Sequence, residues 1–223
     1  MMPRLAAGLL MAVFAVGVSS AEKARKPVPP QPAETYAFHD HHANEHVTIA
    51  AEPGDVKETR PNTRLDYYGH GLMPIRVIVT NESDKPVVLD DARIHFISGN
   101  NDNIPAATPE DIQRRMFTLK GATGRKIPLP LPIPVPITVG KQNVDKKITD
   151  DDNDFGFQTT TVQPHQTVAG YLYYDVNDLD TPVLAHATLE LRKVKFAGGE
   201  YLESFEIPLR GAGEARTKDD ETK

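Results

Sequence analysis

Apolar residues alternate with other residues over short stretches of this chain, and turn-forming residues end each stretch. Ile75, Val77 and Val79 share one face of an extended segment, and the polar run at 81–86 follows directly. A period of two with such a boundary predicts a β-strand followed by a turn. The glycine pair within 197–200 predicts a hairpin turn between two later strands. The other predicted strands lie at 47–50, 87–89, 92–96, 157–162, 168–176, 184–194 and 201–209.

One segment instead has the features of a short helix. Thr108 is a good N-cap, Pro109 suits the first helical position, and Glu110 and Asp111 favour the positive end of the helix dipole. We therefore predict a helix near 109–118. With this helix and about seven to nine strands, the chain is predicted to be all-β, an antiparallel immunoglobulin-like β-sandwich. An up-and-down barrel is the alternative.

The first residues have the three parts of a secretory signal peptide. Arg4 precedes an uncharged run of about fourteen residues, and small residues close that run at 19–21. We predict a signal peptide at 1–21, with cleavage after residue 20 nearly as good, and export to the periplasm or the extracellular space. A retained signal anchor is the alternative. The rest is predicted to be a proline-rich flexible lead at 22–35, one sandwich domain at 36–210 and a charged, disordered tail at 211–223.

Charge and composition exclude several classes of function. The net charge is −6, and the lysines and arginines form no basic stripe, which argues against nucleic-acid binding. The chain has no cysteine, so disulfides, thiol catalysis and thiolate metal sites are excluded together. After signal cleavage, no segment is long and apolar enough to span a membrane.

Prolines and aliphatic residues alternate strictly from Ile127 to Ile137. In an extended strand, the missing N–H donors would all lie on one edge and the aliphatic side chains on one face. We predict a one-sided edge strand, which pairs inward and cannot recruit another chain outward. A polyproline II segment, docked or offered as a ligand, is the alternative.

Five segments together carry a similarity to known proteins. They are 47–53, 73–81, 91–96, 109–115 and 170–176. In these residues the chain resembles an uncharacterised family of exported bacterial proteins, over most of 38–209. The order of a strand ending in Val79-Thr80-Asn81, a proline and then Val87 and Leu89 is also similar to immunoglobulin-like domains of bacterial envelope proteins. The resemblance implies export and a sandwich fold, and it implies no activity.

A histidine cluster is the best candidate for chemistry. Four of the eight histidines lie within 39–46, together with acidic residues. Neutral imidazoles bind Zn²⁺ or Cu²⁺ well, and carboxylates can complete the coordination shell. The candidate ligands are His39, His41, His42, Glu45 and His46. The alternative is a polar segment that leads into the first strand.

Two further groups of residues are weaker candidates. Asp150, Asp152 and Asp154 imitate positions 1, 3 and 5 of a calcium-binding EF-hand loop, but the glycine and glutamate that such a loop requires are missing. A solvated acidic loop is the alternative. Tyr171 and Tyr173 share one face of a predicted strand and could form a binding face for sugar or peptide, or pack across strands instead.

The sequence favours a non-enzymatic binding or structural module of the bacterial envelope. Its partner would be another envelope protein or an envelope polysaccharide. The alternatives are a periplasmic metal-binding protein that uses the cluster from His39 to His46, and a hydrolase with a non-standard site. Catalysis has little support, because no Gly-x-Ser-x-Gly motif or other catalytic set is present. The oligomeric state stays open.

Overall fold

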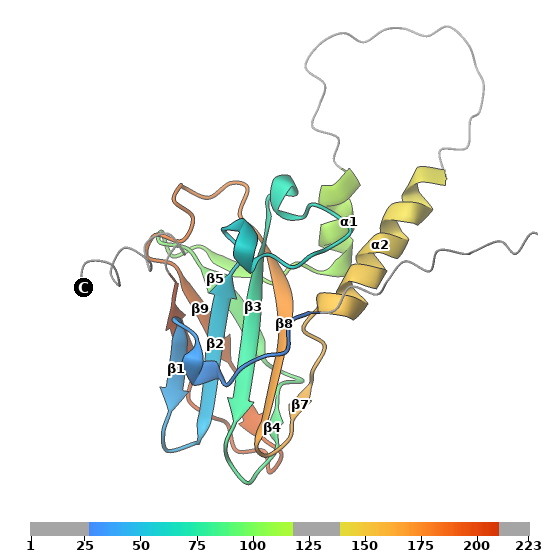
Figure 1. Ribbon diagram of the computed structural model, residues 1–223. Helices are drawn as coiled ribbons and strands as arrows, with labels where there is room; N and C mark the ends of the chain where they lie inside the picture. The colour runs from blue at the N-terminus through green and yellow to red at the C-terminus, as the bar shows by residue number, and fades with distance from the viewer. Residues whose placement is uncertain (1–26, 118–138, 210–223) are drawn as a thin grey trace, which may run out of the picture.

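The computed structural model describes residues 27–117 and 139–209. Within these ranges it contains eleven β-strands in three sheets and two α-helices (Figure 1). Every pairing between these strands is antiparallel. The predicted signal peptide, the proline-rich segment 127–137 and the predicted tail 211–223 lie outside the described residues.

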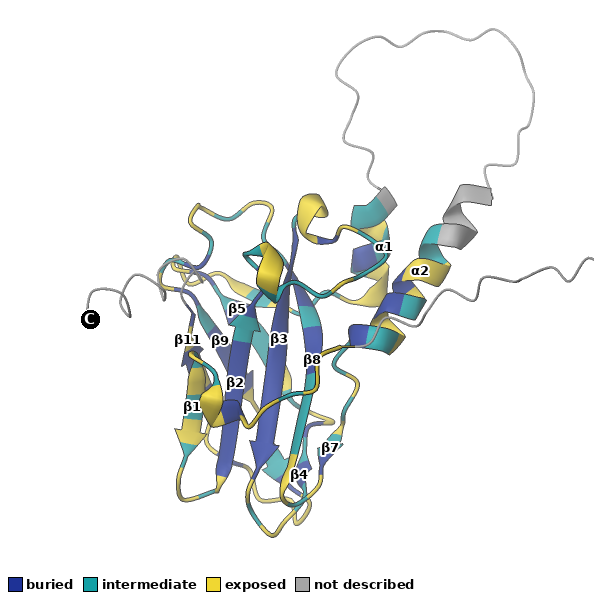
Figure 2. Ribbon diagram, viewed as in Figure 1, coloured by how far each residue is buried: buried dark blue, intermediate teal, exposed yellow. Residues whose placement is uncertain are grey.

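The first sheet has the strand order β1-β2-β3-β8. Its strands are β1 (His39–His42), β2 (Val47–Pro53), β3 (Leu72–Asn81) and β8 (Gln166–Asp175). β3 pairs with β8 over its full length, from Leu72 opposite Asp175 to Asn81 opposite Gln166. All ten residues of β3 are buried, because both faces of the sheet are covered at this strand (Figure 2).

The second sheet has the order β11-β9-β5-β6, and a third, small sheet has the order β10-β4-β7. The second sheet consists of β5 (Arg93–Ile97), β6 (Asn103–Pro105), β9 (Thr188–Arg192) and β11 (Phe205–Pro208). The small sheet consists of β4 (Val87–Val88), β7 (Thr161–Val162) and β10 (Lys195–Phe196).

The first and second sheets share the main hydrophobic core. Ile49, Ile75 and Tyr174 from the first sheet join Phe96 and Phe205 from the second, and all five are fully buried. Burial of each large apolar side chain stabilises the fold by about 1.5–3 kcal/mol. The core also contains Val77 and Val79, so it includes all three period-two residues that the sequence identified on one face. The predicted antiparallel β-architecture is confirmed.

Two helices cover part of the outer face of the first sheet (Figure 2). They are α1 (Pro109–Phe117) and α2 (Val139–Phe155). Leu72, Tyr171 and Tyr173 on that face form a second cluster with Ile112 of α1 and Ile148 of α2. In the part of the chain that the structure describes, no helix combines the length and the apolar character needed to cross a bilayer.

The helix α1 begins as the sequence predicts. The Asp111 N–H donates to Thr108 Oγ1 at 3.2 Å, and the Thr108 N–H donates to Asp111 Oδ2 at the same distance. These reciprocal bonds satisfy backbone donors at the helix start. The hydrogen bonds from the Thr108 hydroxyl and N–H also lower the pKa of Asp111.

The helix α2 lies where the sequence predicted a loop, either a calcium-binding loop or a solvated acidic one, at 150–156. That prediction of a loop was wrong. Residues up to Phe155 are helical. Val144, Ile148 and Phe155 belong to the cluster beneath the two helices, at spacings that put them on one helical face. Three apolar positions among many polar ones give a weak pattern, so the packing surface under the helix decides its conformation.

The segment before β1 also differs from the predicted flexible lead. Ala33 lies in a short 3₁₀ helix, η1 (Ala33–Thr35), and is fully buried against Ala50 and Ile78 of the first sheet. Its N–H donates to Thr80 Oγ1 at 2.8 Å. Further back, the Val28 carbonyl accepts a hydrogen bond from Arg76. The described part of this segment is therefore attached to the outer face of the sheet.

Candidate functional site

The histidine cluster is spread over an edge strand and the turn after it. β1 is extended, so His39 and His41 lie on one face of the sheet and His42 on the other. His41 Nδ1 is 2.7 Å from Thr48 Oγ1. The residues from His39 to His46 therefore do not converge on one point, in contrast to the predicted metal site. Within 27–117 and 139–209, no group of three or more histidine, aspartate or glutamate side chains could hold a metal ion.

His42 and its neighbours join the two main sheets instead. The His42 ring stacks on Phe205 of β11, with 3.8 Å between ring centroids. His42 Nδ1 is 2.8 Å from Glu45 Oε2, and Glu45 Oε1 accepts a hydrogen bond from the Glu203 N–H at 3.0 Å. These contacts fasten β1 to the strand at the edge of the second sheet.

The predicted calcium loop is the last part of α2. Asp150, Asp152 and Asp154 have helical backbone, which cannot wrap around a cation as an EF-hand loop does. Asp154 Oδ2 lies 2.7 Å from Nη1 of Arg64, so the guanidinium of Arg64 neutralises this carboxylate in place of a metal ion. Asp154 and, at 4.0 Å, Asp150 hold the helix against the loop that carries Arg64, whereas the Asp152 side chain accepts a hydrogen bond from Gln158.

The predicted tyrosine face is covered by the helices. Tyr171 is 9% exposed and Tyr173 is 6% exposed, both within the cluster under α1 and α2. Burial raises the pKa of Tyr171 to about 12 and raises that of Tyr173 further. The prediction of a binding face was wrong, because the sequence did not reveal the second helix that packs there.

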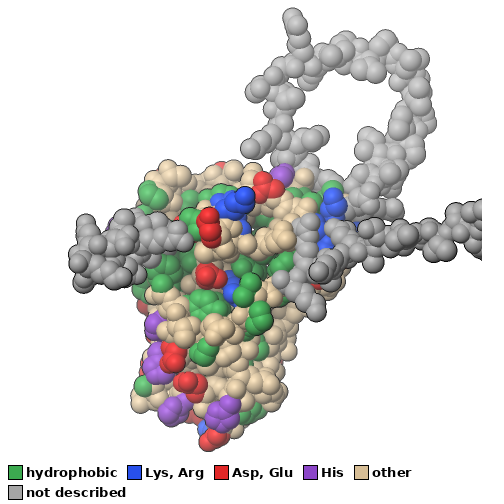
Figure 3. All heavy atoms as spheres, in the orientation of Figure 1, with side chains coloured by type: hydrophobic (Ala, Val, Ile, Leu, Met, Phe, Trp, Pro, Cys, Tyr) green, Lys and Arg blue, Asp and Glu red, His purple; other side chains and the backbone are tan. Residues whose placement is uncertain are grey.

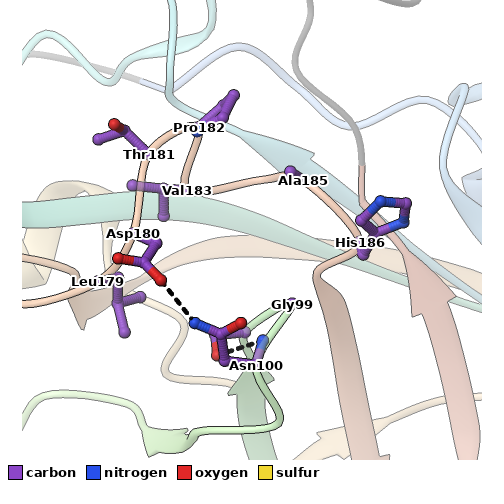
Figure 4. Close-up of a pocket in the computed structure, with 10 residues that line it drawn as sticks. Gly99, Asn100, Leu179, Asp180, Thr181, Pro182, Val183, Ala185 and His186 are labelled. Atoms are coloured by element: carbon purple, nitrogen blue, oxygen red, sulfur yellow. Dashed lines mark hydrogen bonds between the residues drawn. The ribbon is translucent and has the colours of Figure 1, made fainter.

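At the end of the sandwich where β3 begins, two hollows flank the loop 179–186. The smaller has a volume of about 160 Å³ (Figure 4). Across it, the Asn100 side-chain amide donates to Asp180 Oδ2 at 2.8 Å, so two of its polar groups satisfy each other. The other hollow, about 470 Å³, is lined mainly by apolar residues such as Met73, Val176 and Leu184.

Four turns meet at the opposite end of the sandwich and border a hollow of about 610 Å³ that is open to solvent. We call it the four-turn hollow. Its lining is Asn44, Glu45, His46, Glu82, Ser83, Asp84, Lys85, His165, Phe196, Glu200 and Tyr201. Figure 3 shows histidine and acidic side chains gathered toward this lower end of the molecule.

The strand register brings these turns together. Val47 pairs with Asn81, and Asn81 pairs with Gln166, so the turns beside these three residues lie at one end of the first sheet. Phe196 pairs with Val87, which brings the turn at 197–200 to the same end. Turns on a rigid sheet are a common place for binding residues.

Two histidines in the hollow have left-handed backbone conformations. His46 has φ 52° and His165 has φ 57°, values uncommon for residues with side chains. The His46 carbonyl accepts a hydrogen bond from the Glu82 N–H at 2.8 Å, which links two of the turns. His165 Nε2 lies 3.2 Å from Asp84 Oδ1 and links the turn at 82–85 to the turn that carries His165. The hollow is therefore held in shape by contacts between its turns.

An aromatic ring stands at the border of the hollow. Tyr201 is 60% exposed, although its backbone is fixed by a β-bridge to Lys195. Beside it, Lys85 Nζ lies 3.5 Å from Glu200 Oε2 and 5.2 Å from the centre of the Phe196 ring. The hollow thus combines one exposed aromatic face with many hydrogen-bonding groups.

Sequence reasoning found only part of this site. Glu45 and His46 were predicted metal ligands, and the sequence indicated no role for His165. Tyr201, Asp84 and Lys85 were not predicted, since the turn that carries Asp84 and Lys85 lies far from Tyr201 in the chain. The sequence contains one signal for this site, namely that several predicted turns are rich in polar residues. Which turns lie at the same end of the sheet depends on how the strands pair.

Comparisons with known proteins give no match: no family model fits the chain, and no curated protein or solved structure is significantly similar to it. The resemblance to exported bacterial proteins stays a prediction.

Proposed function

We propose that the protein is an exported, non-enzymatic β-sandwich module of the bacterial envelope that binds a partner through the four-turn hollow. The observation that carries this proposal is the hollow itself, built from four turns fixed to one end of paired strands. Its volume of about 610 Å³ is within the range typical of ligand sites. Export rests on the signal-peptide pattern of the sequence.

The exposure of the polar groups favours binding over catalysis. The His165 side chain is 67% exposed and that of Asp84 is 98% exposed. Acid–base catalysis at neutral pH usually depends on groups withdrawn from water, so that their pKa values suit proton transfer. Exposed groups of this kind are better suited to hydrogen bonds with a ligand.

The proposal includes the immunoglobulin-like class of sandwich. Two antiparallel sheets on a common core, with strands paired across long stretches of sequence such as β3 with β8, support this class. The helices α1 and α2 would then be additions on one outer face. An experimental structure compared strand by strand with immunoglobulin-like domains tests this assignment.

Affinity capture from an envelope extract, with cross-linking, tests the binding function. The variants are Asp84→Arg, at the hollow, and Asp178→Arg, a matched charge reversal at another exposed aspartate. We expect the parent protein and Asp178→Arg to recover the same component, and Asp84→Arg to lose it. Recovery of no specific component, or equal recovery by all three proteins, would contradict the proposal.

Cell fractionation tests export separately. We expect the mature protein in the periplasm or the medium, shortened at its N-terminus. Full-length protein that stays in the cytosol would contradict this part of the proposal.

A further inference from the structure

We infer that the ligand of the four-turn hollow is a neutral or amine-bearing polysaccharide, one of whose sugar rings stacks on Tyr201. This inference rests on the proposed binding function and names its ligand class. It is carried by the combination of an available aromatic face, a ring of hydrogen-bonding groups and the charge of the hollow.

The ring of Tyr201 is free to stack on a ligand, whereas that of Tyr68, which is also exposed, is not. The Tyr68 ring is covered by Arg60, whose guanidinium carbon lies 3.6 Å from the ring centroid. Among the described residues, no aromatic or cationic side chain stacks on Tyr201. The hydrogen bond from the Phe196 N–H to the Glu200 carbonyl, at 2.8 Å, fixes the turn that carries it. The ring is therefore presented to solvent at little further cost in backbone entropy.

The groups around Tyr201 suit a ligand with many hydroxyls. Asn44 and His165 can donate or accept hydrogen bonds, and the carboxylates of Glu82, Asp84 and Glu200 can accept them. A sugar ring has one small apolar face and hydroxyls around its edge, which matches a single aromatic ring within a polar border. A protein partner would instead favour a larger apolar centre with several anchoring residues.

The charge of the hollow selects among polysaccharides. Four carboxylates line it, those of Glu45, Glu82, Asp84 and Glu200, against the single ammonium of Lys85. Lys85 already pairs with Glu200. Acidic sugars would meet like charge there, whereas neutral or amine-bearing sugars would not.

The first test measures binding of defined sugars to the mature protein by calorimetry. The probes are a chitosan oligosaccharide, a neutral β-glucan oligosaccharide and a polygalacturonate oligosaccharide. We expect one of the first two to bind and the acidic one to bind at least about tenfold more weakly. Preference for the acidic probe would overturn the assignment, and so would binding of no probe together with failure of the second test.

Variants of Tyr201 locate the sugar. Tyr201→Ala should weaken binding by about tenfold and Tyr201→Phe by no more than about threefold, because the ring and not the hydroxyl makes the contact. Tyr68→Ala is the matched control and should bind as the parent does. Urea unfolding checks that each variant is folded. Unchanged affinity in folded Tyr201→Ala would overturn the inference.

The second test separates this inference from the proposed function. Envelope extract is divided, and one part is digested with proteinase while the other is oxidised with periodate to destroy sugars. Capture that survives proteinase and is lost after periodate supports a polysaccharide. The reverse pattern overturns the sugar and leaves a protein-binding module, and loss of capture from untreated extract contradicts both proposals.

Discussion

Asp151 of α2 accepts hydrogen bonds from both the backbone N–H and the guanidinium of Arg64, a residue 87 positions earlier in the chain. The two N–H···O distances from the Arg64 backbone are 2.9 and 3.0 Å, and Nη1 lies 2.9 Å from Oδ1. The Asp151 side chain is 1% exposed. Hydrogen bonds to Asp154 and Asp151 raise the pKa of Arg64. This pair connects the second helix to the loop before β3.

Asp151→Asn tests whether that connection holds α2 in place. The substitution removes the charge and leaves part of a buried hydrogen-bond network without partners, so we expect a loss of about 1–3 kcal/mol in the free energy of unfolding. Urea unfolding followed by circular dichroism measures it. Asp152→Asn, an exposed neighbour in the same helix, is the control and should change stability by less than about 0.5 kcal/mol. Equal effects of the two substitutions would disprove a specific role for Asp151.

Replacement of tyrosine by phenylalanine should have different effects on stability at Tyr67 and at Tyr173. Their rings lie 4.5 Å apart, yet the Tyr67 hydroxyl donates to Asp151 Oδ2 at 3.1 Å. The Tyr173 hydroxyl is buried with no hydrogen-bond partner among the described residues. Tyr67→Phe should therefore cost about 1 kcal/mol, and Tyr173→Phe should leave stability unchanged or raise it. Thermal or urea unfolding of both variants measures the difference, and a larger loss in Tyr173→Phe would refute this assignment of partners.

Gly170 lies where the chain leaving α2 runs alongside β8, next to the parallel bridge between Gly156 and Tyr171. A Cβ atom there would be 2.4 Å from Cα of Phe157 and 2.6 Å from the Gly156 carbonyl oxygen, both of them backbone atoms. Gly170→Ala should therefore destabilise the fold by about 1–3 kcal/mol. Gly198→Ala is the control, because its Cβ would meet nothing within 4 Å. A parent-like urea midpoint for Gly170→Ala would show that the two segments can separate here without cost in stability.

The buried tyrosines predict a loss of stability at alkaline pH. Burial raises the pKa of Tyr171 from 10.0 to about 12, and it raises the pKa values of Tyr67, Tyr173 and Tyr174 as well. The unfolded chain therefore loses these protons at lower pH than the folded chain. The contribution of the buried, neutral tyrosine hydroxyls to the free energy of unfolding is therefore complete below about pH 10, and it is lost as the pH rises through about 12.

Urea unfolding at a series of alkaline pH values measures this loss. Tyr171→Phe should make the decline shallower, whereas Tyr201→Phe, at an exposed position, should leave it unchanged. A midpoint that stays constant between about pH 9 and pH 12 would contradict the assignment of these buried hydroxyls.

The local elements could be predicted from the sequence because their signals are local. Alternation of Ile75, Val77 and Val79 marks β3, and Thr108 with Asp111 marks the start of α1. Side-chain direction in a strand and capping at a helix start depend on residues only a few positions apart. The antiparallel β-architecture follows from repeating such signals along the chain.

The sites depend on pairings that join distant residues, and the tertiary structure alone decided them. Extended backbone places His39 and His42 on opposite faces of the sheet, so the predicted metal site does not form. Two helices bury Tyr171, so the predicted tyrosine binding face does not form either. The four-turn hollow exists because strand register places the turn before Val47 beside the one after Asn81. A turn shows in the sequence where the chain reverses, but only the hydrogen-bonded ladder between strands determines which other turns lie next to it.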